Sequence, residues 1–241
     1  MCSSRTEAKS LIQAGAVTVD GTAVNKPSYE VCEGSTVLVD RSSKKYVSRG
    51  GLKLEGALAA FDVKIEGRLA LDIGASSGGF TDCLLTRGAK HVIAVDSGSG
   101  QMAPSLRTDE RVTNIENFNA RYMSREDLEY VPEVAVMDVS FISARLILPA
   151  VYNCLASGGD FVCLIKPQFE VGRSGVGKGG IVKDDRLRRQ AVSDVCEVAE
   201  ALGFATVGVV KSPIEGGDGN VEFLAHFKKE GERLEKDNPD T

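Results

Sequence analysis

The stretch LALDIGASSGGFTDCLL, residues 69–85, decides the fold of this chain. An apolar run ends in Asp72, a glycine-rich turn follows, and the pattern then predicts a helix. Strand, glycine turn and helix N-terminus, in this order, begin the nucleotide site of doubly wound α/β proteins. A second apolar run, His91–Val95, ends in Asp96, 22 residues beyond Gly74. A carboxylate at that place can accept hydrogen bonds from ribose hydroxyls.

The spacing of the glycines narrows the class of ligand. A dinucleotide fingerprint requires G-x-G-x-x-G, and Ser76 stands at its second glycine. Asp72 at the tip of the strand would also repel a pyrophosphate. S-adenosylmethionine carries a ribose and cationic groups but no phosphate, so we expect it as the cofactor. NAD, a nucleotide phosphate, or a turn that only joins strand to helix are the alternatives.

Composition limits the class of protein. The chain has 241 residues and is 42% hydrophobic, enough for one core of ordinary size and a small satellite domain. No apolar run reaches the roughly 18 residues of a membrane span, and the N-terminus lacks the apolar core of a signal peptide. We therefore expect a cytoplasmic protein with no membrane partner. Six scattered cysteines fit free thiols, and two histidines on separate predicted strands argue against a metal site.

The net charge of −5 argues by itself against nucleic acid as a partner, but the charge is unevenly distributed. Residues 1–53 carry eight Lys or Arg against five Asp or Glu, net +3, which leaves −8 for the remainder. This asymmetry permits a basic face at the N-terminal end.

Residues 1–43 are predicted to form a small α+β unit. A short helix over 6–14 precedes a hairpin in which Val17–Val19 and Thr22–Val24 flank Asp20-Gly21. Val31 and the run 35–39 supply a further strand. A basic linker follows over 44–51, the second domain spans 52–229, and residues 230–241 form a polar tail.

The rest of the chain alternates strand and helix patterns, which predicts a mostly parallel sheet with helices on both faces. After the first two strands, the expected strands are 112–116, 134–137, 160–165, 205–210 and 221–226. The expected helices are 53–61, 143–155 and 185–202. The glycine-rich segment 172–180 is interpreted either as a mobile lid or as a plain connection.

Ligands of open α/β sheets bind beyond the carboxyl ends of the strands. Asp138 follows the fourth strand and Lys166 follows the fifth, so both are expected at the cofactor crevice. Lys53, on the helix before the first strand, and Glu222, in the last strand, can reach the same region.

Two lysines and two carboxylates around one crevice suggest proton transfer. A ribose 2′-hydroxyl becomes a good nucleophile only when its proton is drawn away. An amine accepts that proton in its neutral form, which burial and a neighbouring cation both favour. For each residue alone, a structural ion pair is the competing interpretation.

The motifs SRGGLKL, LDIGASSGGFTDCLL, MDVSFIS, LIKPQFE and GNVEFL resemble the TlyA family, in which an FtsJ-type methyltransferase domain follows an S4-like RNA-binding domain. The resemblance implies a class I, Rossmann-like α/β sheet whose last strand is antiparallel. It also implies that the protein is a ribosomal RNA cytidine-2′-O-methyltransferase. Members of this family are also labelled hemolysins. The expected partners are ribosomal RNA or ribosomal subunits.

The resemblance also assigns residues. The FtsJ-type catalytic tetrad falls on Lys53, Asp138, Lys166 and Glu222. The cofactor contacts fall on Asp72, Gly74, Ala75, Ser76, Gly78, Gly79, Phe80, Asp96 and Glu116, the last of these near the adenine. The candidates for RNA contact are Arg5, Lys9, Lys26, Lys44, Lys45 and Arg49. The first helix of the S4-like domain is expected to be missing, which bears on RNA affinity.

Two rival functions are considered. A hemolysin-type membrane-active protein would need an amphipathic or spanning segment, and release of contents from lipid vesicles would support it. A catalytically silent RNA-binding module is the second rival, and the complete tetrad argues against it. No oligomeric state or target nucleotide is predicted.

Overall fold

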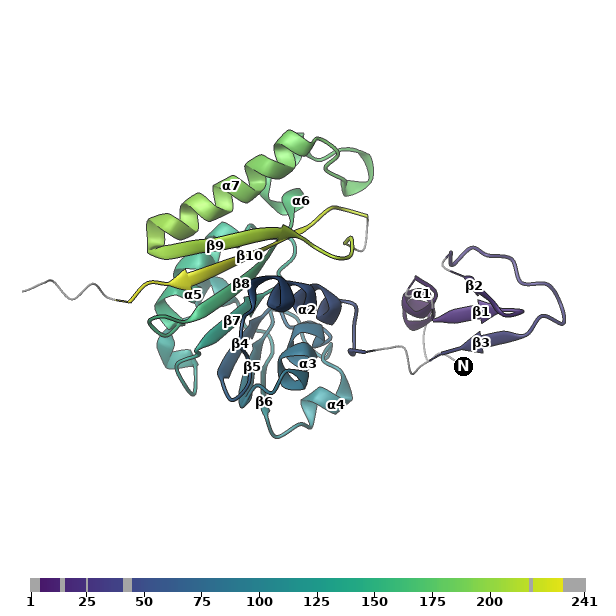
Figure 1. Cartoon of the computed structure of the whole chain (residues 1–241), viewed down its shortest axis with the longest axis horizontal. Helices are drawn as coiled ribbons and strands as arrows, with labels where there is room; N and C mark the ends of the chain where they lie inside the picture. Colours follow the sequence, from purple (N-terminus) through teal and green to yellow (C-terminus); the bar gives the residue numbers. More distant parts are fainter. Residues whose placement is uncertain (1–4, 14–15, 25, 41–44, 217–218, 232–241) are drawn as a thin grey trace, which may run out of the picture.

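The computed structural model describes residues 5–13, 16–24, 26–40, 45–216 and 219–231. The N-terminal unit consists of one helix and a small antiparallel sheet with the order β2-β1-β3 (Figure 1). Its elements are α1 (Arg5–Gln13), β1 (Val17–Val19), β2 (Thr22–Val24) and β3 (Val37–Val39). Leu11, Ala16 and Val17 form its core.

The hairpin β1–β2 follows from the dipeptide that connects it. Asp20 and Gly21 both have positive φ, at 50° and 79°, which is the conformation that a tight type I′ turn requires. The Asp20 carboxylate also accepts a hydrogen bond from the Thr36 amide at 2.8 Å, which ties the turn to the residue that precedes β3. The predicted strand at Val31 is wrong, because that residue lies in an exposed connection.

The second domain is built on a seven-stranded sheet with the order β6-β5-β4-β7-β8-β10-β9 (Figure 1). Neighbouring strands from β6 to β8 run parallel, whereas β10 is antiparallel to both β8 and β9. The predicted α/β class with an antiparallel last strand is therefore confirmed. The strands are β4 (Leu69–Ile73), β5 (His91–Val95), β6 (Val112–Ile115), β7 (Val134–Met137), β8 (Asp160–Ile165), β9 (Phe204–Lys211) and β10 (Phe223–Lys229).

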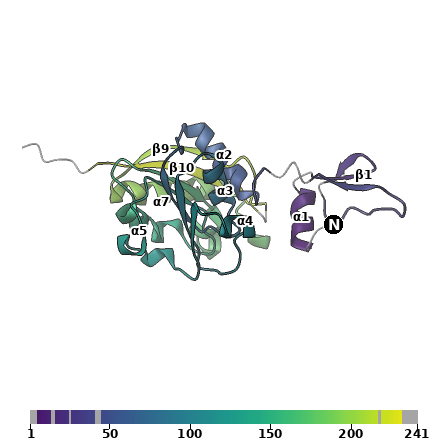
Figure 2. The same cartoon turned by 90° about the horizontal axis from the view of Figure 1, so that it is seen from below.

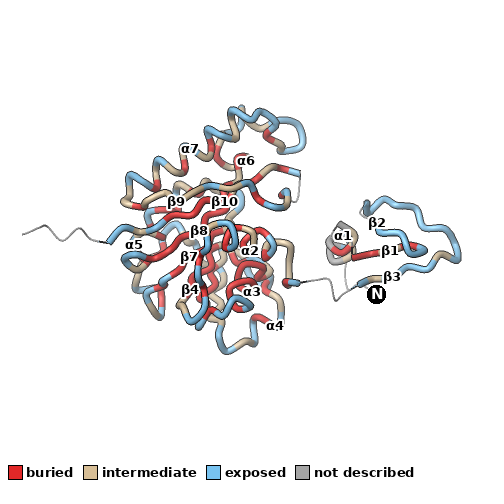
Figure 3. The backbone as a smooth tube through the Cα atoms, in the orientation of Figure 1, coloured by how far each residue is buried: buried red, intermediate tan, exposed pale blue. Residues whose placement is uncertain are grey.

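Helices cover both faces of this sheet (Figures 1 and 2). One face carries α2 (Gly50–Phe61), α3 (Gly79–Thr86) and α4 (Pro104–Arg107). The other carries α5 (Leu148–Cys154) and α7 (Asp185–Leu202), and the short α6 (Pro167–Glu170) follows β8. Figure 3 shows the buried residues concentrated in the central strands, as expected for a parallel sheet covered on both faces.

Several predicted elements have different limits in the structure, and two of these differences concern the helix 143–155 and the last strand. The predicted helix 143–155 is divided into a 3₁₀ turn, η3 (Ala144–Leu146), and α5, because Pro149 in the first turn of α5 has no N–H to continue an earlier helix. Glu222 does not lie within the last strand, which begins at Phe223. The Ser212 amide, just after β9, donates to the Glu222 carbonyl at 2.9 Å.

The glycine-rich segment 172–180 contains two short 3₁₀ turns, η4 (Arg173–Gly175) and η5 (Lys178–Gly180). The buried side chain of Asn220 holds its end: Asn220 Nδ2 donates to the Gly180 carbonyl at 2.9 Å, and Asn220 Oδ1 accepts from the Val182 amide at 3.0 Å.

The last residues of the predicted linker pack against the second domain. Tyr46 is only 3% exposed and lies against Gly51 of α2, where a Cβ would overlap its ring. The Val47 amide donates to Asp82 of α3 at 2.7 Å. An aromatic side chain and a backbone amide hydrogen-bonded to Asp82 thus attach this polar-looking segment to the domain that follows it.

Candidate functional site

Two cavities adjoin each other at the carboxyl ends of the parallel strands. The first, here the lysine cavity, has a volume of about 270 Å³ and is lined by Lys53 and Lys166 among others. The second, here the Asp96 cavity, has a volume of about 590 Å³. Both are lined by Gly74 and Asp138, so one binding site has two compartments that meet at the end of β7. The combined size suits a small organic ligand together with part of a larger substrate.

The predicted glycine turn forms the floor between the two cavities. Gly74 has φ of +82°, and a Cβ there would overlap the carbonyl oxygen of Asp138. Gly78 has φ of +91° at the start of α3, and a Cβ there would overlap Leu106 of α4. Both positions require glycine for backbone conformation and for close approach. At Gly74 the turn therefore brings backbone without a side chain to the wall of both cavities.

Asp96 is held rigidly at the edge of its cavity. Its two carboxylate oxygens accept hydrogen bonds from backbone amides, Oδ2 from Ser76 at 2.8 Å and Oδ1 from Gly98 at 2.7 Å. A carboxylate oxygen can accept more than one hydrogen bond, so acceptor capacity remains for ligand hydroxyl groups.

The chemistry of the Asp96 cavity selects against phosphate. The described residues that line it include two carboxylates, Asp96 and Asp138, and no lysine or arginine. Phe118, Ile142 and Ile147 supply apolar wall. Carboxylates beside an apolar wall fit a nucleoside with a positive charge, whereas the phosphates of NAD or ATP would meet negative charge without a cation partner.

Asp72 lies beneath the turn rather than in the lining of either cavity. It is fully buried, and its Oδ2 accepts from Thr81 Oγ1 at 2.6 Å while its Oδ1 has no hydrogen-bond partner. Desolvation raises the pKa of Asp72 to about 7, with the Thr81 hydrogen bond acting in the opposite direction. The nearby charges of Asp138 and Asp96 raise that pKa further.

Glu116 is also turned away from the two cavities. Its carboxylate accepts from the Gly100 amide at 2.9 Å and from Arg107 at 3.4 Å. These contacts lower its pKa, chiefly through the hydrogen bond from Gly100. Glu116 therefore shapes the segment between β5 and α4. Gly78 also lines neither cavity, whereas the remaining predicted cofactor residues line one or both of them: Gly74, Ala75, Ser76, Gly79, Phe80 and Asp96.

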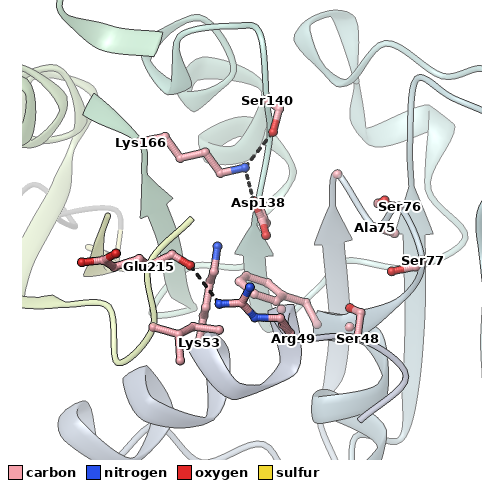
Figure 4. A pocket seen from close by; sticks show the side chains of 15 residues that line it. Ser48, Arg49, Lys53, Ala75, Ser76, Ser77, Asp138, Ser140, Lys166 and Glu215 are labelled. Atoms are coloured by element: carbon pink, nitrogen blue, oxygen red, sulfur yellow. Dashed lines mark hydrogen bonds and ion pairs between the residues drawn. The ribbon is translucent and has the colours of Figure 1, made fainter. Parts of the chain in front are cut away.

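The four residues of the predicted tetrad come together as two ion pairs. Lys53 Nζ of α2 lies 2.5 Å from Glu222 Oε2, and both side chains are buried. Lys166 Nζ lies 2.6 Å from Asp138 Oδ1. Figure 4 shows Lys53 and Lys166 extending into the lysine cavity from different elements, with Asp138 beside the Lys166 amine.

Ser140 is a site residue that the sequence analysis missed. Its hydroxyl oxygen accepts a hydrogen bond from Lys166 Nζ at 2.7 Å (Figure 4). Together with the ion pair to Asp138, this contact fixes the direction of the lysine amine. The signal was its place two residues after Asp138 in the motif MDVSFIS, on the loop that leaves the strand.

Phe141 is a second residue that the sequence analysis missed. It lines the Asp96 cavity, yet it is 93% exposed and has φ of +63°. A positive φ is a costly conformation for an aromatic residue, and such strain is concentrated at functional sites. Its ring contacts that of Phe169, with a centroid distance of 5.3 Å.

The predicted RNA-contact residues fall into two groups. Arg5, Lys9 and Lys26 are exposed on the N-terminal unit, and Lys44 lies outside the described residues. Lys45 forms an ion pair with Glu55 of α2. Arg49 lines the lysine cavity and donates to the Glu215 carbonyl at 3.3 Å (Figure 4). The basic residues therefore lie both on the N-terminal unit and at the cavity itself.

Nowhere in the described ranges do three or more His, Cys, Asp or Glu side chains gather as a metal site would require. Within the same part of the chain, no helix combines the length and apolar character needed to cross a membrane.

Comparison with known proteins now places the chain in a family. The model of the FtsJ-like methyltransferase family matches residues 46–229, which include both cavities. The chain belongs to the FtsJ-like methyltransferase family. The S4 domain model matches residues 1–37 ahead of this FtsJ-like domain.

Relatives of the same construction are found among curated proteins and solved structures. The 16S/23S rRNA (cytidine-2′-O)-methyltransferase TlyA of Mycobacterium tuberculosis is 46% identical, over 95% of this chain and 86% of that protein. Hemolysin A of Brachyspira hyodysenteriae is 44% identical, over 93% of each chain. The structure of a suspected hemolysin from Streptococcus thermophilus has a TM-score of 0.79 and 44% identity, covering 95% of this chain and 84% of that one. The predicted resemblance to the TlyA family is confirmed.

Proposed function

We propose that this FtsJ-like protein is an S-adenosylmethionine-dependent methyltransferase that modifies the ribose 2′-hydroxyl of a cytidine in ribosomal RNA. The observation that carries the proposal is the pair of lysine–carboxylate contacts beside a cavity that disfavours phosphate. The name of the TlyA relative supplies the substrate class.

S-adenosylmethionine fits the Asp96 cavity by its chemistry. The Asp96 carboxylate would accept hydrogen bonds from the ribose hydroxyls, and Phe118 and Ile147 would contact the adenine. Asp138 and the backbone of the Gly74 turn would face the positively charged methionine part. When bound, the cofactor supplies an electrophilic methyl group. Asp72 would act indirectly, by holding the turn through Thr81.

The residues of the lysine cavity would prepare the ribose hydroxyl. The base would be the neutral form of Lys166: its Nζ, oriented by Asp138 and Ser140, would accept the proton from the 2′-hydroxyl as the oxygen becomes a nucleophile. The Asp138 carboxylate balances the positive charge of the resulting ammonium. Lys53, balanced by Glu222, places a second positive charge where negative charge develops on the ribose oxygen.

The basic residues of the N-terminal unit and Arg49 at the cavity would bind the RNA without reading its sequence. Arg5, Lys9 and Lys26 are exposed side chains suited to phosphate contacts, and Arg49 extends the positive surface into the cavity. The proposed division is an RNA-binding domain over 1–43, a linker over 44–51, the methyltransferase domain over 52–229 and a tail over 230–241. Residues 41–44 and 232–241 lie outside the described part of the chain.

The cofactor proposal is tested by titration calorimetry on the full chain. S-adenosylmethionine should bind with a saturable heat and NAD should give none. Asp96→Lys should weaken binding strongly, because it removes the acceptors for the ribose and adds a repelling positive charge. Saturable binding of NAD, with no heat from S-adenosylmethionine, would contradict the assignment of the cavity.

The substrate proposal is tested by mapping ribose methylation in ribosomal RNA from cells with and without this protein. The expected result is at least one 2′-O-methylcytidine that appears only when the protein is present. Identical ribose methylation in both RNA samples, or a dependent modification on a base instead, would contradict the proposal.

A further inference from the structure

We propose that Glu170 is a positioning residue that fixes the spacing between Asp138 and Lys166, a role that rests on the proposed function. Glu170 ends the short helix α6 that follows Lys166, and it does not line either cavity described above. It would act through the loop that carries Asp138 and Ser140.

The pairing of β7 with β8 does not reach Asp138 and Lys166. The parallel pairing of β7 with β8 ends at Met137 and Cys163. Asp138 lies one residue beyond that last pair, and Lys166 lies three residues beyond it. The Asp138 amide is still held by the Ile73 carbonyl of β4 at 2.9 Å, and Ile165, just before Lys166, pairs with Phe223 of β10. Beyond these points the two connections leave the sheet, and a further contact has to set how they lie against each other.

Glu170 supplies that contact. Its Oε2 accepts from Ser143 Oγ at 2.5 Å and from Arg145 Nε at 3.2 Å, and its Oε1 accepts from the Ala144 amide at 2.7 Å. The Glu170 carbonyl accepts a further hydrogen bond from Arg145 Nη2 at 3.2 Å. One residue on the Lys166 side thus binds three consecutive residues on the Asp138 side.

The cost of burying this carboxylate supports a specific role. The Glu170 side chain is only 2% exposed, and a buried charge is unfavourable unless it is paired and hydrogen-bonded. All the side-chain hydrogen bonds described for it go to residues 143–145. Arg145 also lies 3.7 Å from Asp194 of α7, so the contact is anchored to a long helix.

This contact is independent of the reacting groups. The contact between Lys166 and Asp138 changes when the lysine gains or loses a proton or meets the substrate, whereas the Glu170 hydrogen bonds involve none of the transferring atoms. The ring contact between Phe141 and Phe169 joins the same two connections at a second point. A displacement of about 1 Å in the reacting groups of such a site can lower the rate about 100-fold. A change in the spacing between Asp138 and Lys166 should therefore be measurable as a change in rate.

The test compares methyl transfer to ribosomal RNA by the full chain and its variants, at saturating cofactor and at a temperature where circular dichroism shows each one folded. Glu170→Ala should lower kcat by about 10- to 100-fold with a much smaller change in the KM for RNA. Glu170→Gln should lose less, because its amide oxygen can still accept from the Ala144 N–H. The amide proton of Ala144 should move upfield in the NMR spectrum of Glu170→Ala.

Two controls separate positioning from general stability. Val134→Ala opens space in the core at the far end of β7 and should leave kcat unchanged in the folded protein. Glu197→Gln removes an exposed carboxylate from α7 and should change nothing. A Glu170→Ala kcat within about twofold of wild type, or an equal loss in Val134→Ala, would overturn the proposal. An inactive wild-type protein would contradict the proposed function, while the Ala144 resonance would still report whether Glu170 holds the loop.

Discussion

At the scale of single residues, the site depends on which group takes the proton and which groups only orient it. Lys166 has two contacts that fix its amine, Asp138 and Ser140, and it does not line the Asp96 cavity. Binding of the cofactor and removal of the proton are therefore assigned to different side chains, and this separation can be measured.

Lys166→Ala should leave the affinity for S-adenosylmethionine nearly unchanged and abolish methyl transfer in an end-point assay, since a general base contributes about 10²–10⁴-fold in rate. Lys166→Arg should fail as well, because a guanidinium stays protonated and cannot accept the hydroxyl proton. Lys90→Ala, at the opposite end of the sheet, is the matched control. Near-normal turnover by Lys166→Arg would make the residue a charge clamp and leave Asp138 as the candidate base.

Asp72 predicts a pH dependence of stability. Its pKa in the folded chain is about 7, above the usual value of 3.8, so folding favours its protonated form. The stability from this group is fully present below about pH 4 and is lost as the pH rises through 7. Between pH 5 and pH 8 the loss should be about 3 kcal/mol.

In Asp72→Asn this contribution should disappear, and urea titrations at pH 5 and pH 8 measure it as the difference in unfolding free energy. Asp62→Asn removes an exposed carboxylate and serves as the control. An unfolding free energy of Asp72→Asn that falls between pH 5 and pH 8 as much as the wild-type value does would show that Asp72 is ionised throughout.

At the scale of elements, the strands and long helices could be predicted because their periodicity is strong. The helix 185–202 matches α7 in both limits. The path of the segment before Glu222 could not be predicted, because it depends on a hydrogen bond from Ser212, ten residues earlier in the chain. Ser140 and Phe141 were missed for a similar reason, since their roles arise from a loop conformation rather than from a pattern. The cofactor contacts expected at Asp72 and Glu116 stay predictions. In the structure neither residue lines the two cavities, and each carboxylate is hydrogen-bonded to a residue beside them.

Asp160, at the start of β8, connects this strand to β10 and to the residue that precedes β4. Its carboxylate accepts from Arg68 at 2.7 Å and contacts His226 of β10 at 2.9 Å. Desolvation alone would raise the pKa of Asp160, but the His226 and Arg68 contacts outweigh it and lower the pKa to about 2. Stability from this group is therefore present above the usual value of 3.8 and is lost as the pH falls through 2.

Asp160→Asn should lower the unfolding free energy at pH 7 by about 2 kcal/mol, and it should remove the corresponding loss between pH 4 and pH 2. Chemical unfolding across that pH range checks both effects, with Glu197→Gln as the control for charge removal. Unchanged stability at pH 7 would show that the desolvation cost cancels the value of the contacts.

At the scale of the whole molecule, the first 53 residues carry a net charge of +3 and the rest of the chain carries −8. Long-range attraction to RNA therefore has to come from limited regions, chiefly the exposed Arg5, Lys9 and Lys26 of the N-terminal unit. Arg49, just before α2, adds a positive charge at the cavity. This distribution predicts that affinity for RNA and affinity for cofactor are separable.

RNA affinity should fall steeply with salt, because each phosphate contact releases counterions. Replacing Arg5, Lys9 and Lys26 together by Glu should flatten the slope of log affinity against log salt by about 2–3. Cofactor affinity should not change. The measurement is RNA binding between about 50 and 200 mM salt, with Lys90→Glu as the control. An unchanged slope in the triple variant would show that the N-terminal unit does not contact phosphates.

The central claim is that this site transfers a methyl group to a ribose 2′-oxygen. The most direct measurement incubates ribosomal RNA with the purified chain and S-adenosylmethionine carrying an isotopically labelled methyl group, then digests the RNA and identifies labelled nucleosides by mass spectrometry. The wild-type chain should place label in 2′-O-methylcytidine, and Lys166→Ala should place none. Label on a base, or equal labelling by Lys166→Ala, would contradict ribose methylation by this site.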